Sequence, residues 1–263
     1  MAVNNRIIDR KKLPAARPKR VILHWTAGGA EANSDDLQHY HLIVDRTGRL
    51  VWGRHSIADN DSTSDGEYAA HVRGLNTGSI GVAVTGMMGS TEHPFQPGSS
   101  PIAHGQYEIA CRVIAELCQH YALPVTERTV LNHGEVQSIL GVEQRWKWDV
   151  MVLPWNKSLT YEQVGEHFRS RVGYYFEQLQ TLENKTKQPI KQPTGGKGRV
   201  IALSGLNFRT QPDLSGAVFD VLRYGAEVRI IAADRDWFQV RHDGEIGWVY
   251  KKYIQPSDEQ PVG

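Results

Sequence analysis

The stretch Val21-Ile22-Leu23-His24-Trp25-Thr26-Ala27-Gly28-Gly29 carries one histidine near the end of a short apolar run and then continues in small residues. A run of this length and composition is typical of a buried strand. The small residues give the backbone permissive geometry and leave space for a ligand beside the imidazole. A lone histidine on an apolar strand is more often a core residue. This stretch alone therefore leaves two interpretations of His24 open, a metal ligand and a core residue.

The length and composition bound the class of protein. With 263 residues, 40% of them hydrophobic and 22% charged, and a formal net charge of +1, the sequence is typical of an ordinary globular protein of about two domains. No apolar run approaches the roughly 18 residues that a transmembrane helix needs, so we expect no transmembrane segment. The net charge gives no overall case for nucleic-acid binding, and we expect no nucleic-acid partner.

The first twenty residues form a basic arm, with seven lysines and arginines against one acidic residue, Asp9. We expect a solvated leader, with attraction to an anionic surface as the alternative. The arm lacks the apolar segment of about 7–15 residues that a secretory signal contains, so we expect no signal peptide. Export of the protein would then need another route.

Apolar periodicity predicts an α/β first domain. Helical spacing predicts a half-buried helix over 103–121, which carries Cys111 and Cys118 about 10 Å apart along its axis. At that separation the two cysteines cannot pair with each other. A capping box of Thr160 and Gln163 predicts the start of a helix that closes the domain. Strands are predicted at 40–44 and 49–52, joined by a turn at Gly48, and at 79–86 and 129–131.

A second, β-rich domain follows a linker. The stretch from Asn184 to Gly198 is polar, contains prolines and a Gly-Gly pair, and shows no apolar period, which is typical of a linker. Short β-rich runs follow, and the Asp243-Gly244 pair is a strong hairpin signal. About sixty residues of such strands predict a small barrel. The predicted strands are 199–203, 206–209, 218–222, 227–232, 237–241 and 246–250.

His24, His133 and Asp149 are candidate metal ligands with nitrogen and oxygen donors. Two histidines and one carboxylate leave zinc an open fourth position for water. Zinc there would polarise a carbonyl and lower the pKa of the water towards about 7, which suits hydrolysis at neutral pH. The three residues lie far apart in the sequence and form no compact metal motif, so their spacing alone is a weak signal.

Lys147 and Tyr40 are candidates for catalytic roles beside these ligands. Lys147 lies two residues before Asp149, so in an extended segment both side chains point to the same face. A cation there could stabilise an oxyanion. Tyr40 begins the predicted hairpin that follows the His24 strand in sequence, and its hydroxyl could orient or deprotonate a water molecule.

The motifs around these residues resemble those of a known family. Besides the His24 strand they are Tyr40-His41-Leu42-Ile43 with Arg46-Thr47-Gly48, His71-Val72-Arg73-Gly74-Leu75-Asn76 with Ser79-Ile80-Gly81-Val82, and Lys147-Trp148-Asp149. Together and in this order they resemble the zinc-dependent N-acetylmuramoyl-L-alanine amidases, the family that includes the bacteriophage lysozyme-type amidases and the peptidoglycan recognition proteins. The resemblance covers residues 18 to 180.

The resemblance implies an α/β fold with a central mixed β-sheet flanked by helices. It implies a Zn²⁺ ion held by His24, His133 and Asp149. It also implies that Tyr40 and Lys147 are the catalytic tyrosine and lysine of the family.

Two departures bear on this assignment. One branch of the family uses a glutamate on the strand that matches 79–85, and Ala83 corresponds to it here, which places the sequence on the tyrosine branch. The interval before Asp149 is longer than in the shortest phage members, which suggests that Ser138 to Trp146 is an insertion beside the cleft. Asp149 is therefore the least secure ligand: it could be a surface carboxylate, with Glu143 as the next candidate.

Other residues near the motifs have roles that the sequence leaves open. We predict that Thr26 and His71 bind substrate, with a hydrogen-bonded structural role as the equal alternative for His71. A structural or rim role is favoured for His39 and His41. Four tryptophans pose a choice between stacking on a sugar ring and packing in the core, and the core is favoured: Trp25, Trp52, Trp146 and Trp148.

The second domain resembles the bacterial SH3-like domains in Leu206-Asn207-Phe208-Arg209-Thr210-Gln211-Pro212 and in Gly247-Trp248-Val249-Tyr250. The resemblance covers Gly198 to Gln255 and implies a small all-β barrel. Such domains commonly bind cell-wall peptide or glycan, and a spacer or protein-docking module is the alternative. We therefore expect four parts: a basic arm over 1–17, an amidase domain over 18–182, a linker over 183–197 and an SH3-like wall-binding domain over 198–257.

The leading hypothesis is a monomeric peptidoglycan hydrolase that cleaves the amide between N-acetylmuramic acid and L-alanine of the stem peptide. The alternatives are a non-catalytic peptidoglycan recognition module and a cytosolic amidase that recycles muropeptides. The complete set of implied site residues favours catalysis, and a wall-binding second domain speaks against recycling. Without a signal peptide, we expect synthesis in the cytoplasm and release to the wall or periplasm by a holin-like lesion or a secretion machine. Phage endolysin and secreted effector both stay open.

Overall fold

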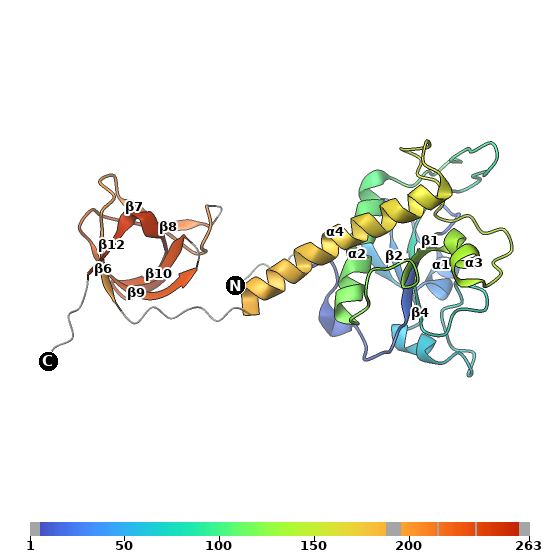
Figure 1. Ribbon diagram of the computed structural model, residues 1–263, viewed down its shortest axis with the longest axis horizontal. Helices are drawn as coiled ribbons and strands as arrows, with labels where there is room; N and C mark the ends of the chain where they lie inside the picture. The colour runs from blue at the N-terminus through green and yellow to red at the C-terminus, as the bar shows by residue number, and fades with distance from the viewer. Residues whose placement is uncertain (1–5, 188–195, 215, 235, 258–263) are drawn as a thin grey trace. The chain divides into compact units, whose positions relative to one another are not determined.

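The computed structural model describes residues 6–187, 196–214, 216–234 and 236–257. The chain divides into two compact units, Met1–Leu182 and Glu183–Gly263. Figure 1 shows the first unit as a sheet with helices packed against it and the second as a curled array of strands. None of the helices in the described ranges is long and apolar enough to cross a membrane.

The strands of the first unit, within the described residues, are β1 Arg20–Trp25, β2 Leu42–Val44, β3 Leu50–Trp52, β4 Ser79–Val84 and β5 Val130–Asn132. They form one sheet in the order β3-β2-β4-β1-β5. The pairs β1–β4, β1–β5 and β2–β4 are parallel, whereas β2 and β3 form an antiparallel hairpin. Gly48 has a φ of 87° in the hairpin turn, a conformation that favours glycine. The predicted mixed sheet is confirmed.

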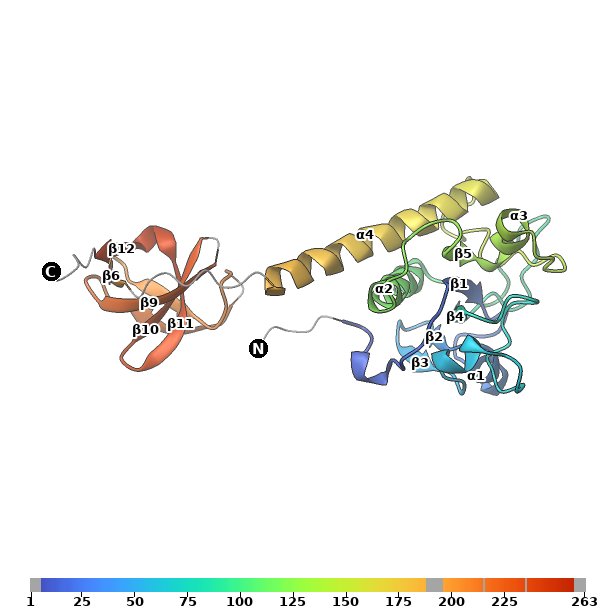
Figure 2. The ribbon, with the colours of Figure 1, turned by 60° about the horizontal axis from the view of Figure 1, so that its bottom comes forward.

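Two helices, α2 (His104–His120) and α4 (Tyr161–Lys187), pack against one face of this sheet (Figure 2). Leu23 of β1 joins their apolar core, whereas Ile22 lies in a separate cluster. Because side chains alternate along a strand, His24 points away from α2 and α4, to the side of Ile22. The remaining helical segments in the described part of the first unit are α1 Ser34–His39, α3 Val136–Leu140, and the 3₁₀ turns η1 Arg10–Lys12, η2 Ile57–Asp61 and η3 His133–Glu135. Both cysteines, in α2, are buried and unpaired, as predicted.

The basic arm packs on α2 and is not the solvated leader that the charge pattern predicts. Ile8 is buried, and the amides of Ile7 and Ile8 donate to the Glu116 carboxylate at 2.9 and 2.8 Å. Arg6 Nη2 donates to Gln119 Oε1 at 2.7 Å. The two isoleucines supply apolar surface and the carboxylate accepts two backbone amides, which together hold the described part of the arm. Residues 1–5 lie outside the described residues.

The helix α4 begins at the predicted capping box. The Thr160 amide donates to Gln163 Oε1 at 2.9 Å, and the Gln163 amide donates to Thr160 Oγ1 at 3.3 Å. The helix continues to Lys187, so the structure differs from the linker predicted at 183–197. Extending an existing helix fixes one residue for each new hydrogen bond and needs no apolar face, which explains the difference. Residues 188–195 of that linker lie outside the described residues.

The second unit, in its described residues, is an antiparallel seven-stranded array in the order β12-β6-β9-β10-β11-β7-β8. Its strands are β6 Lys197–Val200, β7 Leu206–Arg209, β8 Val218–Leu222, β9 Glu227–Asp234, β10 Trp237–His242, β11 Glu245–Tyr250 and β12 Ile254–Ser257. The predicted all-β fold is confirmed. The structure differs from the strand predicted at 199–203, because β6 ends at Val200. Leu203 is exposed in a turn before Gly205, whose φ is 89°. The sequence does not indicate β12, since Pro256 interrupts it.

Candidate metal centre

Two neighbouring parallel strands place His24 and His133 side by side. In the register of β1 and β5, the residues that precede the two histidines lie opposite each other. His24 is still in β1, whereas His133 opens η3. Asp149 is brought to the same place because the Gly134 amide donates to the Asp149 carbonyl oxygen at 2.5 Å. Three residues that are far apart in sequence therefore meet beyond the carboxyl ends of the strands.

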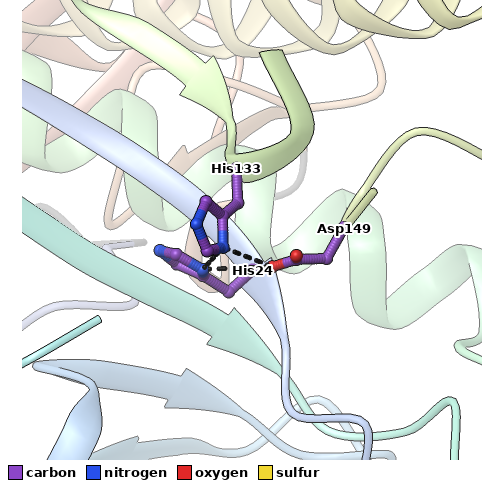
Figure 3. A group of neighbouring side chains, drawn as sticks. All are labelled: His24, His133 and Asp149. Carbon is purple, nitrogen blue, oxygen red and sulfur yellow. Dashed lines mark hydrogen bonds and ion pairs between the residues drawn. The ribbon is translucent and has the colours of Figure 1, made fainter. Parts of the chain in front are cut away.

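His24 Nδ1, His133 Nδ1 and Asp149 Oδ2 form a triangle (Figure 3). The two nitrogens are 3.0 Å apart, and the carboxylate oxygen lies 3.1 Å from His24 Nδ1 and 3.0 Å from His133 Nδ1. The three residues are buried, with exposed fractions of 0%, 4% and 6%. Among the described residues, this is the one group of histidine, cysteine or acidic side chains whose spacing suits a metal ion.

Gln144 determines which nitrogen of His133 carries the proton. Gln144 Nε2 donates to the carbonyl oxygens of Arg73 and Val142 at 2.9 and 3.1 Å, which turns Gln144 Oε1 towards His133 Nε2 at 3.0 Å. An amide oxygen only accepts, so His133 Nε2 is the donor. In the neutral imidazole the other nitrogen is then unprotonated, and the Nδ1 lone pair of His133 faces the triangle.

His71 determines the protonation of His24 in the same way. His71 Nε2 donates to the Ser79 carbonyl oxygen at 3.2 Å, so its unprotonated Nδ1 accepts from His24 Nε2 at 3.0 Å. This leaves a lone pair on His24 Nδ1. Burial, together with the neighbouring His133, lowers the pKa of His24 to about 4, and burial lowers the pKa of His71 well below its usual value. Both rings are therefore neutral at pH 7.

The triangle thus brings together three atoms that carry lone pairs, the Nδ1 atoms of the two imidazoles in their neutral form and Oδ2 of Asp149. Burial opposes ionisation of Asp149, but the neighbouring His133 and His24 outweigh it and hold the pKa of the carboxyl well below its usual value. Three such atoms at 3.0–3.1 Å repel one another unless a cation lies among them. Two imidazole nitrogens and one carboxylate oxygen form a donor set that zinc prefers, so the residues present fit this ion.

A cavity of about 420 Å³ opens in front of the triangle. Arg73 and Arg145 line it beside Lys147, so its wall carries positive charge. A carbonyl placed at the triangle would therefore meet cations on this side. The lining includes these residues of the predicted site: Thr26, Tyr40, His71, His133, Lys147 and Asp149.

Tyr40 lies beside His24, with ring centroids 5.1 Å apart and ring planes at 43°. Burial, and next the charge of Asp149, raise the pKa of the Tyr40 hydroxyl above its usual value. The hydroxyl therefore keeps its proton at neutral pH and can donate a hydrogen bond. In the register of β1 and β4, Ala83 lies opposite His24. The position that the resemblance assigns to a glutamate in one branch of the family is therefore next to His24, and the tyrosine branch stays a prediction.

Thr26 and His71 line the cavity, but protein groups already engage their polar atoms. Thr26 Oγ1 accepts from the amides of Gly28 and Gly86 at 3.1 and 3.2 Å. Both ring nitrogens of His71 are bonded, to His24 and to the Ser79 carbonyl. A substrate contact of Thr26 and His71 stays a prediction, and their observed contacts support the walls of the site.

The structure supports the roles favoured for His41 and His39. His41 is buried, with Nδ1 accepting from the Gly81 amide at 2.9 Å and Nε2 bonded to Asn60 Oδ1 at 3.0 Å, so it is structural. His39 is exposed at the cavity, where its Nδ1 donates to the Asp35 carbonyl oxygen at 2.7 Å. Neither histidine joins the triangle.

In the segment Ser138 to Trp146, the structure adds one residue to the site, Gln144, and corrects the prediction for another, Trp146. Gln144 was not predicted, because no sequence motif marks a glutamine that bonds a ligand histidine. Trp146 is 95% exposed, so its interpretation as a core residue is wrong, whereas Trp25, Trp52 and Trp148 belong to the core or pack against it. Glu143 is exposed, and Asp149 instead completes the triangle.

Fold and site together define an α/β protein with a buried candidate metal centre beyond the ends of its parallel strands. Residues 14–149, more than half of the chain, match the N-acetylmuramoyl-L-alanine amidase family, and the chain belongs to this family. Residues 204–255 match the bacterial SH3 domain. Both resemblances seen in the sequence are confirmed.

Solved structures also resemble the chain. NlpC2 from Trichomonas vaginalis is 15% identical over 26% of this chain and 25% of its own length, with a TM-score of 0.22, so the chain spans only that share of it. The endolysin N-acetylmuramoyl-L-alanine amidase LysCS from Clostridium intestinale URNW is 12% identical over 60% of this chain and 85% of that one, with a TM-score of 0.37. The Ph2119 endolysin from Thermus scotoductus MAT2119 bacteriophage Ph2119 is 17% identical over 62% and 88%, with a TM-score of 0.35. A comparison with curated proteins gave no match.

Proposed function

We propose that the protein is a zinc-dependent peptidoglycan hydrolase that cleaves the amide between N-acetylmuramic acid and the L-alanine of the stem peptide. The observation that carries the proposal is the buried triangle of His24, His133 and Asp149, whose lone pairs converge beside an open cavity. Membership of the amidase family supports the choice of bond.

The ligands and their partners prepare the site before substrate arrives. His24, His133 and Asp149 would hold the ion, and His71 and Gln144 orient the two imidazole rings. Zinc, when bound, polarises the scissile carbonyl and activates a water molecule for attack.

Lys147 and Tyr40 act on the reacting groups from the cavity wall. The Lys147 ammonium stabilises the negative charge that develops on the carbonyl oxygen. The protonated Tyr40 hydroxyl orients the attacking water by a hydrogen bond. This set of groups goes beyond what a recognition module needs, which favours catalysis over binding alone.

The second unit carries the wall-binding part of the proposal. Its match to the bacterial SH3 domain supports an arrangement in which it holds the catalytic unit at a polymeric substrate. We place the site of action at the cell wall, reached from the cytoplasm through a membrane lesion or a secretion machine, with the chain acting as a monomer.

Mass spectrometry of purified sacculi tests the proposal. Sacculi digested with the zinc-loaded chain should release peptides with a free L-alanine amino group and leave glycan strands with free lactyl carboxylates. The matched control is His133→Ala, which should release neither product. Products cut at glycosidic bonds or within the peptide would overturn the assignment.

A further inference from the structure

Trp146 is the most exposed of the large apolar side chains in the described parts of the chain, at 95%. Tryptophan carries a large apolar surface that proteins usually bury at least in part. The backbone at Arg145 and Trp146 is left-handed, with φ of 49° and 64°. Such a conformation costs free energy in a residue with a side chain and persists where the surroundings impose it. The backbone conformation of the loop therefore directs the indole of Trp146 towards solvent.

Gln144 anchors the base of this loop. Besides its bonds to His133, Arg73 and Val142, its main-chain amide donates to Gln137 Oε1 at 3.1 Å. A buried residue with all of these bonds leaves the backbone before Trp146 little freedom. An exposed aromatic ring on a fixed loop loses little entropy when a ligand packs against it.

A hollow of about 470 Å³ lies beside Trp146. Gln137, Ser138 and Glu143 line it, and all three are exposed side chains that offer hydrogen-bonding groups. The hollow shares Gln144, Arg145 and Lys147 with the lining of the cavity in front of the triangle, so the two spaces adjoin at these residues. A ligand that reaches the triangle can therefore extend beside Trp146.

We infer that this hollow is a subsite for a pyranose ring of a glycan strand, stacked on the indole of Trp146. The inference rests on the proposed function: the scissile amide joins a sugar to a peptide, so a sugar chain must leave the triangle over one of the surfaces that adjoin its cavity. A flat apolar face rimmed by amide, hydroxyl and carboxylate groups matches a ring with an apolar face and equatorial polar substituents. The subsite takes a sugar next to the N-acetylmuramic acid whose amide is cut, and it makes the enzyme prefer strands over single-sugar substrates.

Indole N–H signals in a proton–nitrogen NMR spectrum of the full chain test the subsite directly. Each of the seven tryptophans gives one signal, and Trp146→Phe identifies that of Trp146 by its loss. A peptide-free tetrasaccharide of alternating N-acetylglucosamine and N-acetylmuramic acid, added up to roughly 10 mM, should shift the Trp146 signal. Signals of Trp237 and Trp248 report separately on any sugar bound by the second unit. A Trp146 signal that does not move would overturn the inference.

Substrate length provides the second test. The ratio of kcat/KM for a tetrasaccharide-peptide to that for a muramoyl-peptide should exceed one in the wild type and fall about fivefold to tenfold in Trp146→Ala. Trp146→Phe should restore part of the ratio, and Tyr174→Ala, which removes another exposed aromatic ring of the first unit, should leave it unchanged. An unchanged ratio in Trp146→Ala would contradict the subsite.

The two tests separate this inference from the proposed function. If the Trp146 signal shifts but no amide is cleaved, the subsite stands and the catalytic proposal fails. If the amide is cleaved, but the Trp146 signal does not shift and Trp146→Ala leaves the kcat/KM ratio unchanged, the catalytic proposal stands and the subsite fails.

Discussion

The two units of the chain differ in what they bury. The first unit buries several polar side chains beside its cavity, among them His24, His71, His133, Gln144 and Asp149. The described residues of the second unit bury no polar or charged side chain, and its core consists of residues such as Val200, Phe208 and Val240. Both units have an apolar core, so the difference lies in the polar groups that one of them keeps from water.

Buried polar side chains mark the part of the molecule whose function can be inferred from its geometry. A buried polar group costs free energy unless it is bonded, and each bond fixes an orientation. The chains of bonds through Gln144 and His71 therefore reveal which lone pairs face the triangle. The described residues of the second unit contain no buried polar side chain, so the ligand of this unit is proposed from its family match and not from its geometry.

The largest effects are expected where the triangle itself is broken. His24→Ala, His133→Ala and Asp149→Ala should each lose bound zinc and amide cleavage together, because two remaining ligands hold zinc poorly. Elemental analysis measures the zinc. In the wild type, zinc at about 100 times its dissociation constant should also stabilise the first unit by about 2.7 kcal/mol, an effect absent from the variants.

One outcome would move the third ligand elsewhere. If Asp149→Ala keeps its zinc while Lys147→Ala loses it, the segment is out of register and Glu143 becomes the candidate. The unfolding transition of the second unit is the internal control, since it should not respond to zinc in any variant.

The next effects separate catalysis from metal binding within the first unit. Lys147→Ala should keep full zinc occupancy and lower kcat about 10²- to 10³-fold, because an oxyanion-stabilising charge is felt mainly in the transition state. Tyr40→Phe should keep zinc and lower kcat by up to about 10²-fold, because it removes the hydrogen bond that orients the attacking water. Substrate affinity should change little in either. Loss of zinc from Tyr40→Phe would assign the hydroxyl to the metal and not to water.

Cutting the chain near Gly195 tests whether the two units work separately. The piece 1–190 should still cleave soluble muropeptides but bind sacculi about 100-fold more weakly, because tethering raises the local concentration only at a surface. Co-sedimentation with sacculi measures the binding of both pieces. If the piece 197–263 stays in the supernatant, the wall-binding role of the second unit is wrong.

A smaller effect is expected from the support of the triangle. Gln144→Ala should weaken zinc binding about 10- to 100-fold, since it frees the His133 ring to rotate and change tautomer. Gln144→Glu keeps an acceptor for His133 Nε2 and should retain most of the affinity, although it loses the bonds to Arg73 and Val142. Competition with a chelator measures both. Equal zinc affinity in wild type and Gln144→Ala would show that the ring is held by other groups.

The smallest effect concerns the fold around the site and depends on pH. Burial opposes ionisation of Asp45, but hydrogen bonds from Thr47 and Arg49 in the β2–β3 turn outweigh it and lower its pKa. Because the folded pKa lies below the unfolded one, this stabilisation is complete above about pH 4 and is lost as the pH falls through the folded value. Asp45→Asn should cost about 2 kcal/mol of unfolding free energy at pH 7. The gap should shrink in acid, and a gap that does not change with pH would contradict the assignment.

The sequence predicts the elements whose side chains repeat regularly. The apolar runs predict β1 and β4, the glycine turn predicts the β2–β3 hairpin, and the capping box predicts the start of α4. The resemblance adds the ligand set and the catalytic pair, because these residues stand in motifs of fixed order. The sequence alone cannot show that Gln144 reaches His133 or that Trp146 is exposed, because both facts depend on the path of one irregular loop. The prediction of a solvated arm was based on charge alone, and charge gives no weight to the two isoleucines that hold the arm on α2.

The central claim is that the triangle of His24, His133 and Asp149 is a catalytic zinc site. A titration of the zinc-free full chain with zinc, with amide cleavage of a muramoyl-peptide read at each step, tests it most directly. The account predicts no cleavage without zinc and a linear rise that stops at one equivalent per chain. Zinc-free protein that cleaves the amide at the full rate would contradict it.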